Sequence, residues 1–596
     1  MNLIRNRVIV YQTIILAALS FIILDLLILY QTPPAKGYEH DIYSAYPNIF
    51  WYLIYASIGL GSSVIIMEIM QKRPGRWWLA GAGVVIFSNF LIMLVPIDRG
   101  YYVLGRGDSI IHVGGILDVV NHGFFGSLYP HGLNPYPLIH MTMGTTSIFS
   151  GIEPAMFSFL TPVIFTLFFM VCVPIAVEAI TQNIRYAMAS FLFCTPMLFG
   201  LSFFMLAPSV QFLLFFPFVL YVIFETIKAR SFANVLILLM IATSTPFFHN
   251  GDGTIMAVLF LLSIIVITYF FSIFQGWNND IAPILARVKN ISNVLLVMLI
   301  AWISWILNFE AFSWNVEQLW KNMIYGRIGT GGVTDVYVPN QKSIYGFIEG
   351  VGQIEFILMI IAVISFLYFI NHWRKGHLHA TASIILSFAI IMIGITVIAY
   401  VADISNWLTY RRFLKFTLIF STIATGLLVV EFMNYNKIFR YGTALISFLI
   451  VITIVFTSVP TVFESPNINT VSGDVNRMEC DGIQWLLSEK SDNYIDEIGI
   501  SQARFSIGVF GGINEFDNVR YWSNNRPPDY FYTKNLNTYG ANIPDDRYLI
   551  CTTLSGINDP TSKTFMQLKY LNVIDNSAGR IYSNGNFWCY YINSTA

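Results

Sequence analysis

Charged residues are scarce in this chain. They make up 11% of its 596 residues, and hydrophobic residues make up 56%, whereas soluble domains carry roughly 25% charged residues. The 33 Lys and Arg nearly balance the 34 Asp and Glu, so the net charge is −1. Such a balance offers no basic surface to nucleic acid. The composition therefore argues against a soluble enzyme and a nucleic-acid-binding protein, and it predicts an integral membrane protein.

Cysteine is also scarce, and two common motifs are missing. None of the five cysteines stands in a Cys-x-x-Cys pair, so no metal site is predicted from them. Cys480, Cys551 and Cys589 lie in the polar C-terminal part, where one disulfide is compatible with the sequence, although the pair is not identified. No Gly-x-x-x-x-Gly-Lys-Ser/Thr motif occurs, so ATP-driven transport has no support.

Long apolar runs are what the chain has instead. A helix needs about 20 apolar residues to cross a bilayer, and thirteen segments come close to that length. The predicted spans are 8–30, 50–70, 77–97, 155–181, 187–206, 209–227, 233–248, 254–274, 291–311, 353–371, 380–402, 413–433 and 441–461.

The distribution of Lys and Arg predicts the orientation of these spans. If the N-terminus is cytoplasmic, the short inner segments hold 14 Lys and Arg, and the much longer outer loops hold 8. An excess of basic residues marks the cytoplasmic side. We therefore predict a multi-pass protein of the cell membrane with a cytoplasmic N-terminus. Its main outer loops are 31–49, 98–153 and 312–352.

The chain becomes polar from about residue 464. We predict a transmembrane domain over 1–463 and an extracytoplasmic α+β domain over 464–596, which is long enough for its own core. Residues 497–509 are expected to form a strand. Residues 580–592 are expected to form a hairpin, which Asn584-Gly585 would close with a type I′ turn.

The polar stretch from Arg106 to Glu153 holds four of the nine histidines. Asp108 and His112 are four residues apart, so they share one face of the helix predicted over 108–125. Its apolar positions suit an interfacial helix along the outer leaflet. Asp108 there can act as a general base toward an acceptor hydroxyl, with His112 beside it. Two alternatives stay open: capping of the helix by Asp108 or Ser109, and a divalent cation held by Asp108 and His112.

Basic residues collect at other outer span ends. Arg411 and Arg412 are adjacent at the mouth of one span, and Arg suits bidentate phosphate binding; snorkelling to lipid headgroups is the alternative. His249 ends another span and is a second candidate for phosphate binding. Arg106 lies between two glycines beside an Asp, which suits either anion binding or a local salt bridge.

Further polar residues complete the set. Asp403 and Glu310 also stand at outer span ends, and either is a candidate for a second carboxylate in the site. Asp25 lies within the first span and should face protein or water rather than lipid. His122, His131 and His140 are expected to be hydrogen-bonded loop histidines, with sugar or phosphate binding as the alternative.

This architecture resembles the GT-C superfamily, whose members are integral membrane glycosyltransferases that use polyprenyl-phosphate-linked sugars, and in particular its large archaeal members. The order and common sidedness of four segments carry the resemblance. They are Gly105-Arg-Gly-Asp-Ser-Ile-Ile-His112, Pro246-Phe-Phe-His249, Tyr410-Arg-Arg-Phe-Leu414 and Ile581-Tyr-Ser-Asn-Gly-Asn-Phe587.

The resemblance implies an acidic residue in an early outer loop, which Asp108 matches, and basic residues that hold the donor phosphate, which His249, Arg411 and Arg412 match in type and side. The lipid carrier would lie in a groove open to the bilayer. The family's acid usually follows the first span, whereas Asp108 follows the third, so Asp41 is an alternative counterpart. The outer loops contain no Asp-x-Asp, which favours transfer of one sugar over transfer of a whole oligosaccharide.

Together these features predict an inverting membrane glycosyltransferase with a polyprenyl- or dolichyl-phosphate-linked sugar as donor. The acceptor hydroxyl would belong to a glycan, a lipid-linked glycan or a protein on the outer face. No cofactor is predicted with certainty, and a divalent cation stays open. A polytopic transporter or lipid flippase with an outer accessory domain is the alternative.

Overall fold

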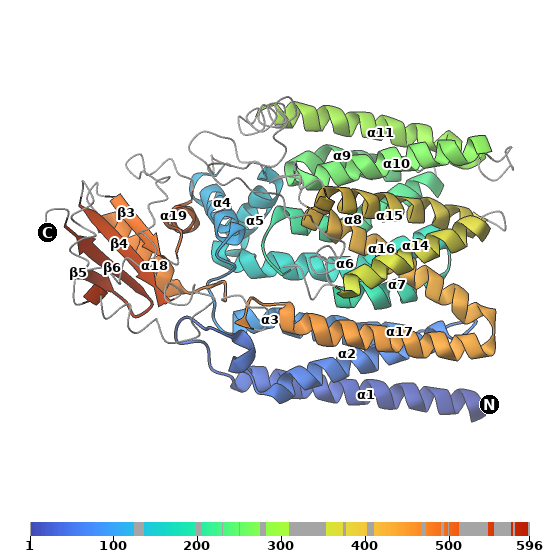
Figure 1. Cartoon of the computed structure of the whole chain (residues 1–596), viewed down its shortest axis with the longest axis horizontal. Helices are drawn as coiled ribbons and strands as arrows, with labels where there is room; N and C mark the ends of the chain where they lie inside the picture. Colours follow the sequence, from blue (N-terminus) through green and yellow to red (C-terminus); the bar gives the residue numbers. More distant parts are fainter. Residues whose placement is uncertain are drawn as a thin grey trace.

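The computed structural model places a long helical bundle beside a small sheet-containing domain (Figure 1). It describes residues 2–123, 136–197, 204–228, 231–249, 251–274, 282–308, 353–372, 377–401, 410–466, 472–489, 494–498, 500–511, 546–553, 574–575 and 578–593.

Every predicted span overlaps a helix of the bundle. Eight of these helices are long and apolar enough to cross a membrane, and five are apolar but shorter within the described residues. The polytopic α-helical fold is therefore confirmed, while thirteen crossings stay a prediction. The helices are α1 (Asn2–Gln31), α2 (Asn48–Ile69), α3 (Trp77–Asp98), α6 (Phe157–Thr181), α7 (Ile184–Met197), α8 (Pro208–Lys228), α9 (Phe232–Phe248), α10 (Asp252–Phe274), α11 (Ala282–Ile306), α14 (Gln353–His372), α15 (His377–Val401), α16 (Tyr410–Tyr435) and α17 (Lys437–Ser458).

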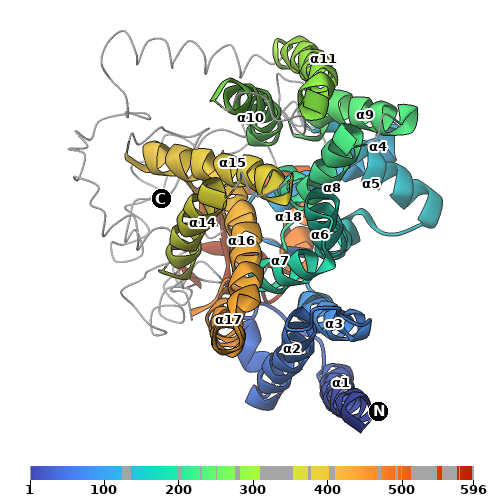
Figure 2. The ribbon, with the colours of Figure 1, turned by 90° about the vertical axis from the view of Figure 1, so that its right-hand side faces the viewer.

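Helix α16 forms the centre of the bundle. It packs against α7, α14, α15 and α17, as the view along the bundle shows (Figure 2). Small and hydroxylated residues let these helices approach closely; a Cβ on Gly426 would lie 2.6 Å from the backbone nitrogen of Ser190 in α7. Helix α1 lies at the periphery with many apolar side chains exposed, as expected of a face in contact with lipid.

The N-terminus and the C-terminal domain lie at opposite ends of the bundle (Figure 1). We call the end that carries the C-terminal domain the domain end and the opposite one the far end. An odd number of crossings between residues 2 and 464 produces this arrangement. Which end faces the cytoplasm stays a prediction.

The predicted outer stretch between α3 and α6 lies at the domain end. It forms β1 (Val103–Leu104), α4 (Asp108–His122), α5 (Pro137–Ser150) and the 3₁₀ turn η2 (Pro154–Met156). The helix predicted from Asp108 is thus present, but its expected position on the membrane surface is wrong. Ile110, Val113 and Ile116 are buried in protein, because α4 is enclosed by α5, α6 and a helix of the C-terminal domain.

The C-terminal domain is α+β, as expected. Its four-stranded sheet has the order β3-β4-β6-β5, in which β3 and β4 are parallel and the other pairs are antiparallel. Strand β2 lies apart and pairs with β1, so it joins the domain to the segment before α4. The elements are β2 (Asp474–Val475), α18 (Arg477–Glu489), β3 (Tyr494–Ile498), α19 (Gln502–Phe510), β4 (Arg547–Thr552), β5 (Gly579–Ser583) and β6 (Phe587–Ile592).

Two local predictions in this domain need correction. The strand expected over 497–509 ends at Ile498, and α19 follows, because its Phe505–Gly508 segment packs against α4 rather than into the sheet. The hairpin of β5 and β6 is present, but its turn is not type I′. Among the described residues, Gln182 alone of the non-glycines has a positive φ, so Asn584 lacks one and Gly585 has φ 98°. The Asn584 side chain instead accepts from the Phe587 N–H at 3.1 Å.

All five cysteines are buried and free. Cys551 pairs with Trp588 and Ile550 pairs with Cys589 across β4 and β6. Directly opposed residues share a face of the sheet, so Cys551 and Cys589 point to opposite faces and form no disulfide.

Candidate functional site

Asp108 begins α4 and presents its carboxylate to solvent. The N-cap position belongs to Gly107, which makes no side-chain cap bond. The Ser109 hydroxyl donates to the carbonyl of Leu206 at 3.2 Å. Capping by Asp108 or Ser109 is therefore wrong as an explanation of this motif. The Asp108 side chain is 72% exposed, so its carboxylate is open to solvent.

His112 lies one turn further along α4, buried against α5. Its Nδ1 is 3.0 Å from Nε2 of His140. Burial lowers the pKa of His112 to about 4; Asp108 opposes this shift and His249 adds to it. Burial also lowers the pKa of His140, and His112 adds to that shift. Both imidazoles are therefore neutral at pH 7, and one N–H···N hydrogen bond joins them.

His249 joins this cluster from a different part of the chain. It follows α9, and its Nδ1 accepts from the Gly253 N–H at 3.1 Å. A neutral His249 therefore carries its proton on Nε2, which makes that nitrogen a hydrogen-bond donor. Tyr136 bridges the two parts: its ring stacks on His249 at 5.3 Å and meets His112 edge-on at 5.5 Å. The structure thus brings together Asp108, His112 and His249, three of the residues that the sequence proposes for the site.

The C-terminal domain contributes a residue that sequence reasoning missed. Arg504 of α19 places Nη1 3.9 Å from Oδ1 of Asp108. Its segment is predicted as a strand, and no signal in the sequence connects it with Asp108. Glycines make the approach of the two helices possible. A Cβ on Gly114 of α4 would lie 2.2 Å from the carbonyl oxygen of Ile507, and one on Gly508 would lie 2.4 Å from Ile110.

Arg106 is engaged with the same domain. Its Nη2 donates to both carboxylate oxygens of Glu479, at 2.6 and 2.8 Å, and to the carbonyl of Asp474 at 3.0 Å. Glu479 is completely buried. Of the two sequence-based alternatives for Arg106, this contact favours a salt bridge, although the partner comes from a distant segment. Anion binding by Arg106 stays a prediction.

Arg411 and Arg412 are exposed in the first turn of α16. Helix α17 follows α16 after one residue and ends beside the C-terminal domain, so the start of α16 lies at the domain end. The two arginines are therefore at the same end of the bundle as Asp108. Nε of Arg411 is 3.3 Å from the hydroxyl of Tyr410. Phosphate binding by this pair stays a prediction.

The remaining candidates are separate from this cluster or not described. Asp41 accepts from the Tyr43 N–H at 3.0 Å and caps the 3₁₀ turn η1 (Ile42–Ala45), which is a structural role. Asp403, Glu310, His131 and the whole loop 312–352 lie outside the described residues. Nδ1 of His122 lies 3.0 Å from the Asp118 carboxylate within α4, at hydrogen-bond distance. Within the described ranges, no group of three or more His, Cys, Asp and Glu is arranged to hold a metal ion.

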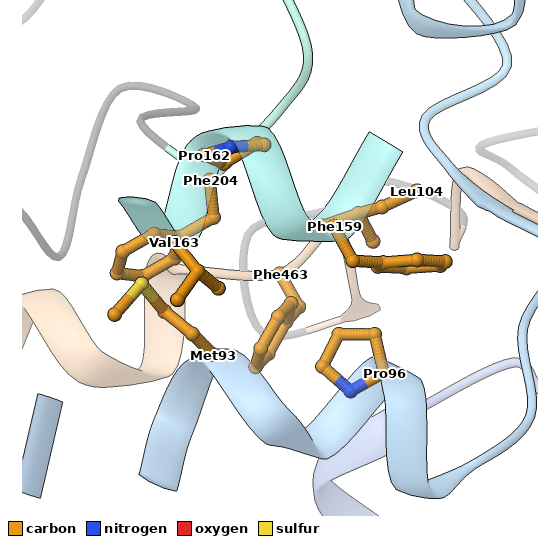
Figure 3. A pocket seen from close by; sticks show the side chains of 8 residues that line it. All are labelled: Met93, Pro96, Leu104, Phe159, Pro162, Val163, Phe204 and Phe463. Carbon is orange, nitrogen blue, oxygen red and sulfur yellow. The ribbon is translucent and has the colours of Figure 1, made fainter. Parts of the chain in front are cut away.

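A small pocket lies close to the start of α4 but is unsuited to a sugar (Figure 3). It lies between α3 and α6, and its volume of about 10 Å³ is room for roughly one water molecule. No charged side chain lines it. The lining residues are Met93, Pro96, Leu104, Phe159, Pro162, Val163, Phe204 and Phe463.

No family model matches the chain, and no curated protein does. The chain is similar to several solved structures, among them an oligosaccharyltransferase and ArnT. The Archaeoglobus fulgidus oligosaccharyltransferase, complexed with zinc and sulfate, is 12% identical with a TM-score of 0.48, over 86% of this chain and 73% of that one. ArnT from Cupriavidus metallidurans is 10% identical with a TM-score of 0.44. Its apo form aligns over 86% of this chain, and its complex with undecaprenyl phosphate over 87%; each alignment covers 98% of ArnT. All TM-scores are below 0.5, so these similarities do not establish a family for the chain.

Proposed function

We propose that this protein is a membrane glycosyltransferase of the GT-C type. It transfers one sugar from a polyprenyl- or dolichyl-phosphate donor to an acceptor hydroxyl, with inversion at the anomeric carbon. The observation that carries the proposal is the meeting of Asp108, His112 and His249, from two distant segments, at the domain end of the bundle. The donor suits the bilayer, and the acceptor is a glycan, a lipid-linked glycan or a protein at the extracytoplasmic face.

Asp108 is the general base of this reaction. Its exposed carboxylate takes the proton of the acceptor hydroxyl while that oxygen attacks the anomeric carbon. The bond from this carbon to the phosphate oxygen breaks in the same displacement, and the polyprenyl phosphate leaves with the electron pair. Attack from the face opposite the leaving group inverts the configuration. Asp108 then releases its proton to water.

Negative charge develops on the departing phosphate, and positively charged groups or hydrogen-bond donors are needed to stabilise it. Arg411 and Arg412 are bidentate donors suited to it, and the hydrogen bond from Gly253 to Nδ1 leaves a neutral His249 with an N–H donor at Nε2. Such electrostatic stabilisation supplies the larger share of the barrier reduction. Neutral His112 adds no charge beside Asp108 and offers a hydrogen bond to the acceptor. No step of this mechanism passes through a metal ion.

Asparagine variants at two positions test the base. Purified protein in nanodiscs is given polyprenyl-phosphate mannose or glucose together with an alkyl glycoside as the acceptor, and the release of polyprenyl phosphate is measured together with the anomeric configuration of the glycoside formed. We expect Asp108→Asn to lower turnover by about 10²- to 10⁴-fold, the usual contribution of a general base. The unfolding temperature should stay unchanged, because the carboxylate is exposed.

Asp41→Asn is the matched control, since Asn also caps a turn, and it should retain turnover. A folded, active Asp108→Asn protein would show that Asp108 is not the base. If Asp41→Asn were inactive instead, the base would be Asp41.

The transporter alternative predicts polar groups deep in several spans. Asp25 in α1 is one, fully buried, with both oxygens lacking a hydrogen-bond partner among the described residues. The hydroxyls of Thr417 and Thr425 in α16 donate to carbonyls of their own helix, whereas the hydroxyl of Ser421 in the same helix is buried without a partner among the described residues. A flippase would move a fluorescent lipid across the membrane of proteoliposomes without releasing polyprenyl phosphate, whereas the glycosyltransferase would release polyprenyl phosphate as it transfers the sugar.

A further inference from the structure

His140 occupies a space made for its ring between α5 and α4. The side chain is fully buried. Gly115 of α4 lies against it, and a Cβ there would come within 2.8 Å of Cε1 and Nδ1 of His140. One turn later Gly144 of α5 leaves room for Val119, at 2.6 Å from the position of its missing Cβ. The crossing of α4 and α5 therefore depends on glycines that bring the two imidazoles together.

The contact between the imidazoles is specific. Nε2 of His140 is 3.0 Å from Nδ1 of His112, and the rings are tilted by 37°. Two neutral imidazoles form such a bond only if one donates N–H and the other accepts with a lone pair. The tautomer of one ring therefore fixes that of the other. Nε2 is the nitrogen that remains to His112 for any other partner.

The other residues of the candidate site surround His112. Asp108 precedes it by one helical turn, and Arg504 of the C-terminal domain lies 3.9 Å from that carboxylate. The Tyr136 ring meets His112 edge-on, with His249 stacked behind it. His140 contacts Nδ1 of His112. It is thus a fully buried polar partner that can hold the His112 ring in place.

We propose that His140 is a positioning residue for the transfer reaction. Its Nε2 holds His112 in one ring orientation and one tautomer, and so decides whether Nε2 of His112 donates or accepts toward the acceptor beside Asp108. The role is that of an outer partner that orients an active imidazole. This inference rests on the proposed glycosyltransferase function, since it names the residue that prepares His112 for that reaction.

Two substitutions of His140 distinguish a role in positioning His112 from a role in filling the core. Glutamine brings an amide to about the place of Nε2 and can donate or accept a hydrogen bond. Leucine fills the space without polar atoms. His372→Leu is the control, because His372 is a hydrogen-bonded histidine at the far end, where its Nδ1 contacts the carbonyl of Tyr368 at 2.8 Å.

The kinetic test uses the full chain in nanodiscs with polyprenyl-phosphate mannose as the donor and an alkyl glycoside as the acceptor. We expect His140→Leu to lower kcat by about 10- to 100-fold, as loss of an orienting partner does elsewhere, with KM for the donor little changed. His140→Gln should stay within about threefold of the unaltered protein, and His372→Leu should equal it. Equal kcat for His140→Leu and the unaltered protein, or equal losses for the Gln and Leu variants, would overturn the proposal.

A spectroscopic test does not depend on turnover. In protein with ¹⁵N-labelled histidine rings, solid-state NMR distinguishes the two neutral tautomers, and the His112 signals are identified by their loss in His112→Asn. We expect one tautomer in the unaltered protein and in His140→Gln, and a mixture in His140→Leu. A mixture already present in the unaltered protein would refute the positioning role, even if His140→Leu failed to fold.

The two proposals fail in different ways. If the unaltered protein bound polyprenyl-phosphate mannose without releasing polyprenyl phosphate, the glycosyltransferase function would fail, while the NMR test of the histidine pair would still decide whether His140 orients His112. If transfer required Asp108 but tolerated His140→Leu, only the positioning role would be lost.

Discussion

Single residues in this site differ sharply in how far solvent reaches them. Asp108 begins a helix, and its carboxylate is exposed to solvent beside Arg504. One turn away, His112 is buried and neutral. An exposed carboxylate beside an uncharged imidazole is suited to accepting a proton from an acceptor hydroxyl. The neutral imidazole adds no positive charge to that of Arg504 beside the carboxylate.

A different buried carboxyl should make the protein's stability depend on pH. Asp474 pairs with β1 at the junction of the C-terminal domain. Burial raises its pKa to about 7, while Ser472, Tyr101 and Arg106 oppose the shift and Glu39 adds to it. The unfolded chain loses this proton near pH 4, whereas the folded protein keeps it until about pH 7. The stabilisation is therefore complete below pH 4 and lost as pH rises to about 7.

We accordingly expect the unfolding temperature to fall between pH 5 and pH 8. Asp474→Asn should remove much of that slope and raise stability at pH 8 by a few kcal/mol, because each pKa unit corresponds to about 1.4 kcal/mol. Thermal unfolding of both proteins across this pH range measures the effect. Parallel curves for the two proteins would mean that Asp474 does not carry the pH dependence.

At the scale of elements, the crossing of α4 and α19 attaches the C-terminal domain to the site. Two glycines, Gly114 and Gly508, face each other's helix at distances that leave no room for a methyl group. The ion pair of Arg106 and Glu479 fixes the same junction from the side. Removal of one partner from a buried pair is strongly destabilising, because it leaves an uncompensated charge. The domain is therefore a structural part of the candidate site.

Replacement of a glycine by alanine should have opposite effects on stability inside this crossing and away from it. Gly114→Ala places a methyl group 2.2 Å from a backbone oxygen of α19, and overpacking of this kind costs about 1–3 kcal/mol. Gly83→Ala in α3 meets nothing within 4 Å, so the better helix propensity of Ala should stabilise by up to about 1 kcal/mol. Thermal unfolding should show the two shifts with opposite signs. Equal shifts would contradict the close crossing.

At the scale of the whole molecule, the sequence predicts features that depend on one segment and misses contacts between distant segments. Runs of apolar residues and the 3.6-residue period of 108–125 act within one segment, so the spans and α4 are readable. The helix α19 is not, because its β-branched and aromatic residues resemble a strand until α4 packs against them. Likewise the contacts of Arg504 with Asp108 and of Glu479 with Arg106 join segments hundreds of positions apart.

The orientation of the whole molecule can be tested with introduced cysteines. All five native cysteines are buried and free, so a membrane-impermeant maleimide should label the unaltered protein little. Lys36 is exposed at the domain end and Lys437 at the far end. In sealed cells we expect Lys36→Cys to be labelled from outside and Lys437→Cys to be labelled only after permeabilisation, because basic residues favour the cytoplasmic side.

The reverse labelling pattern would place the candidate site in the cytoplasm, away from an extracytoplasmic acceptor. Labelling of both from outside would contradict an odd number of spans between residues 36 and 437.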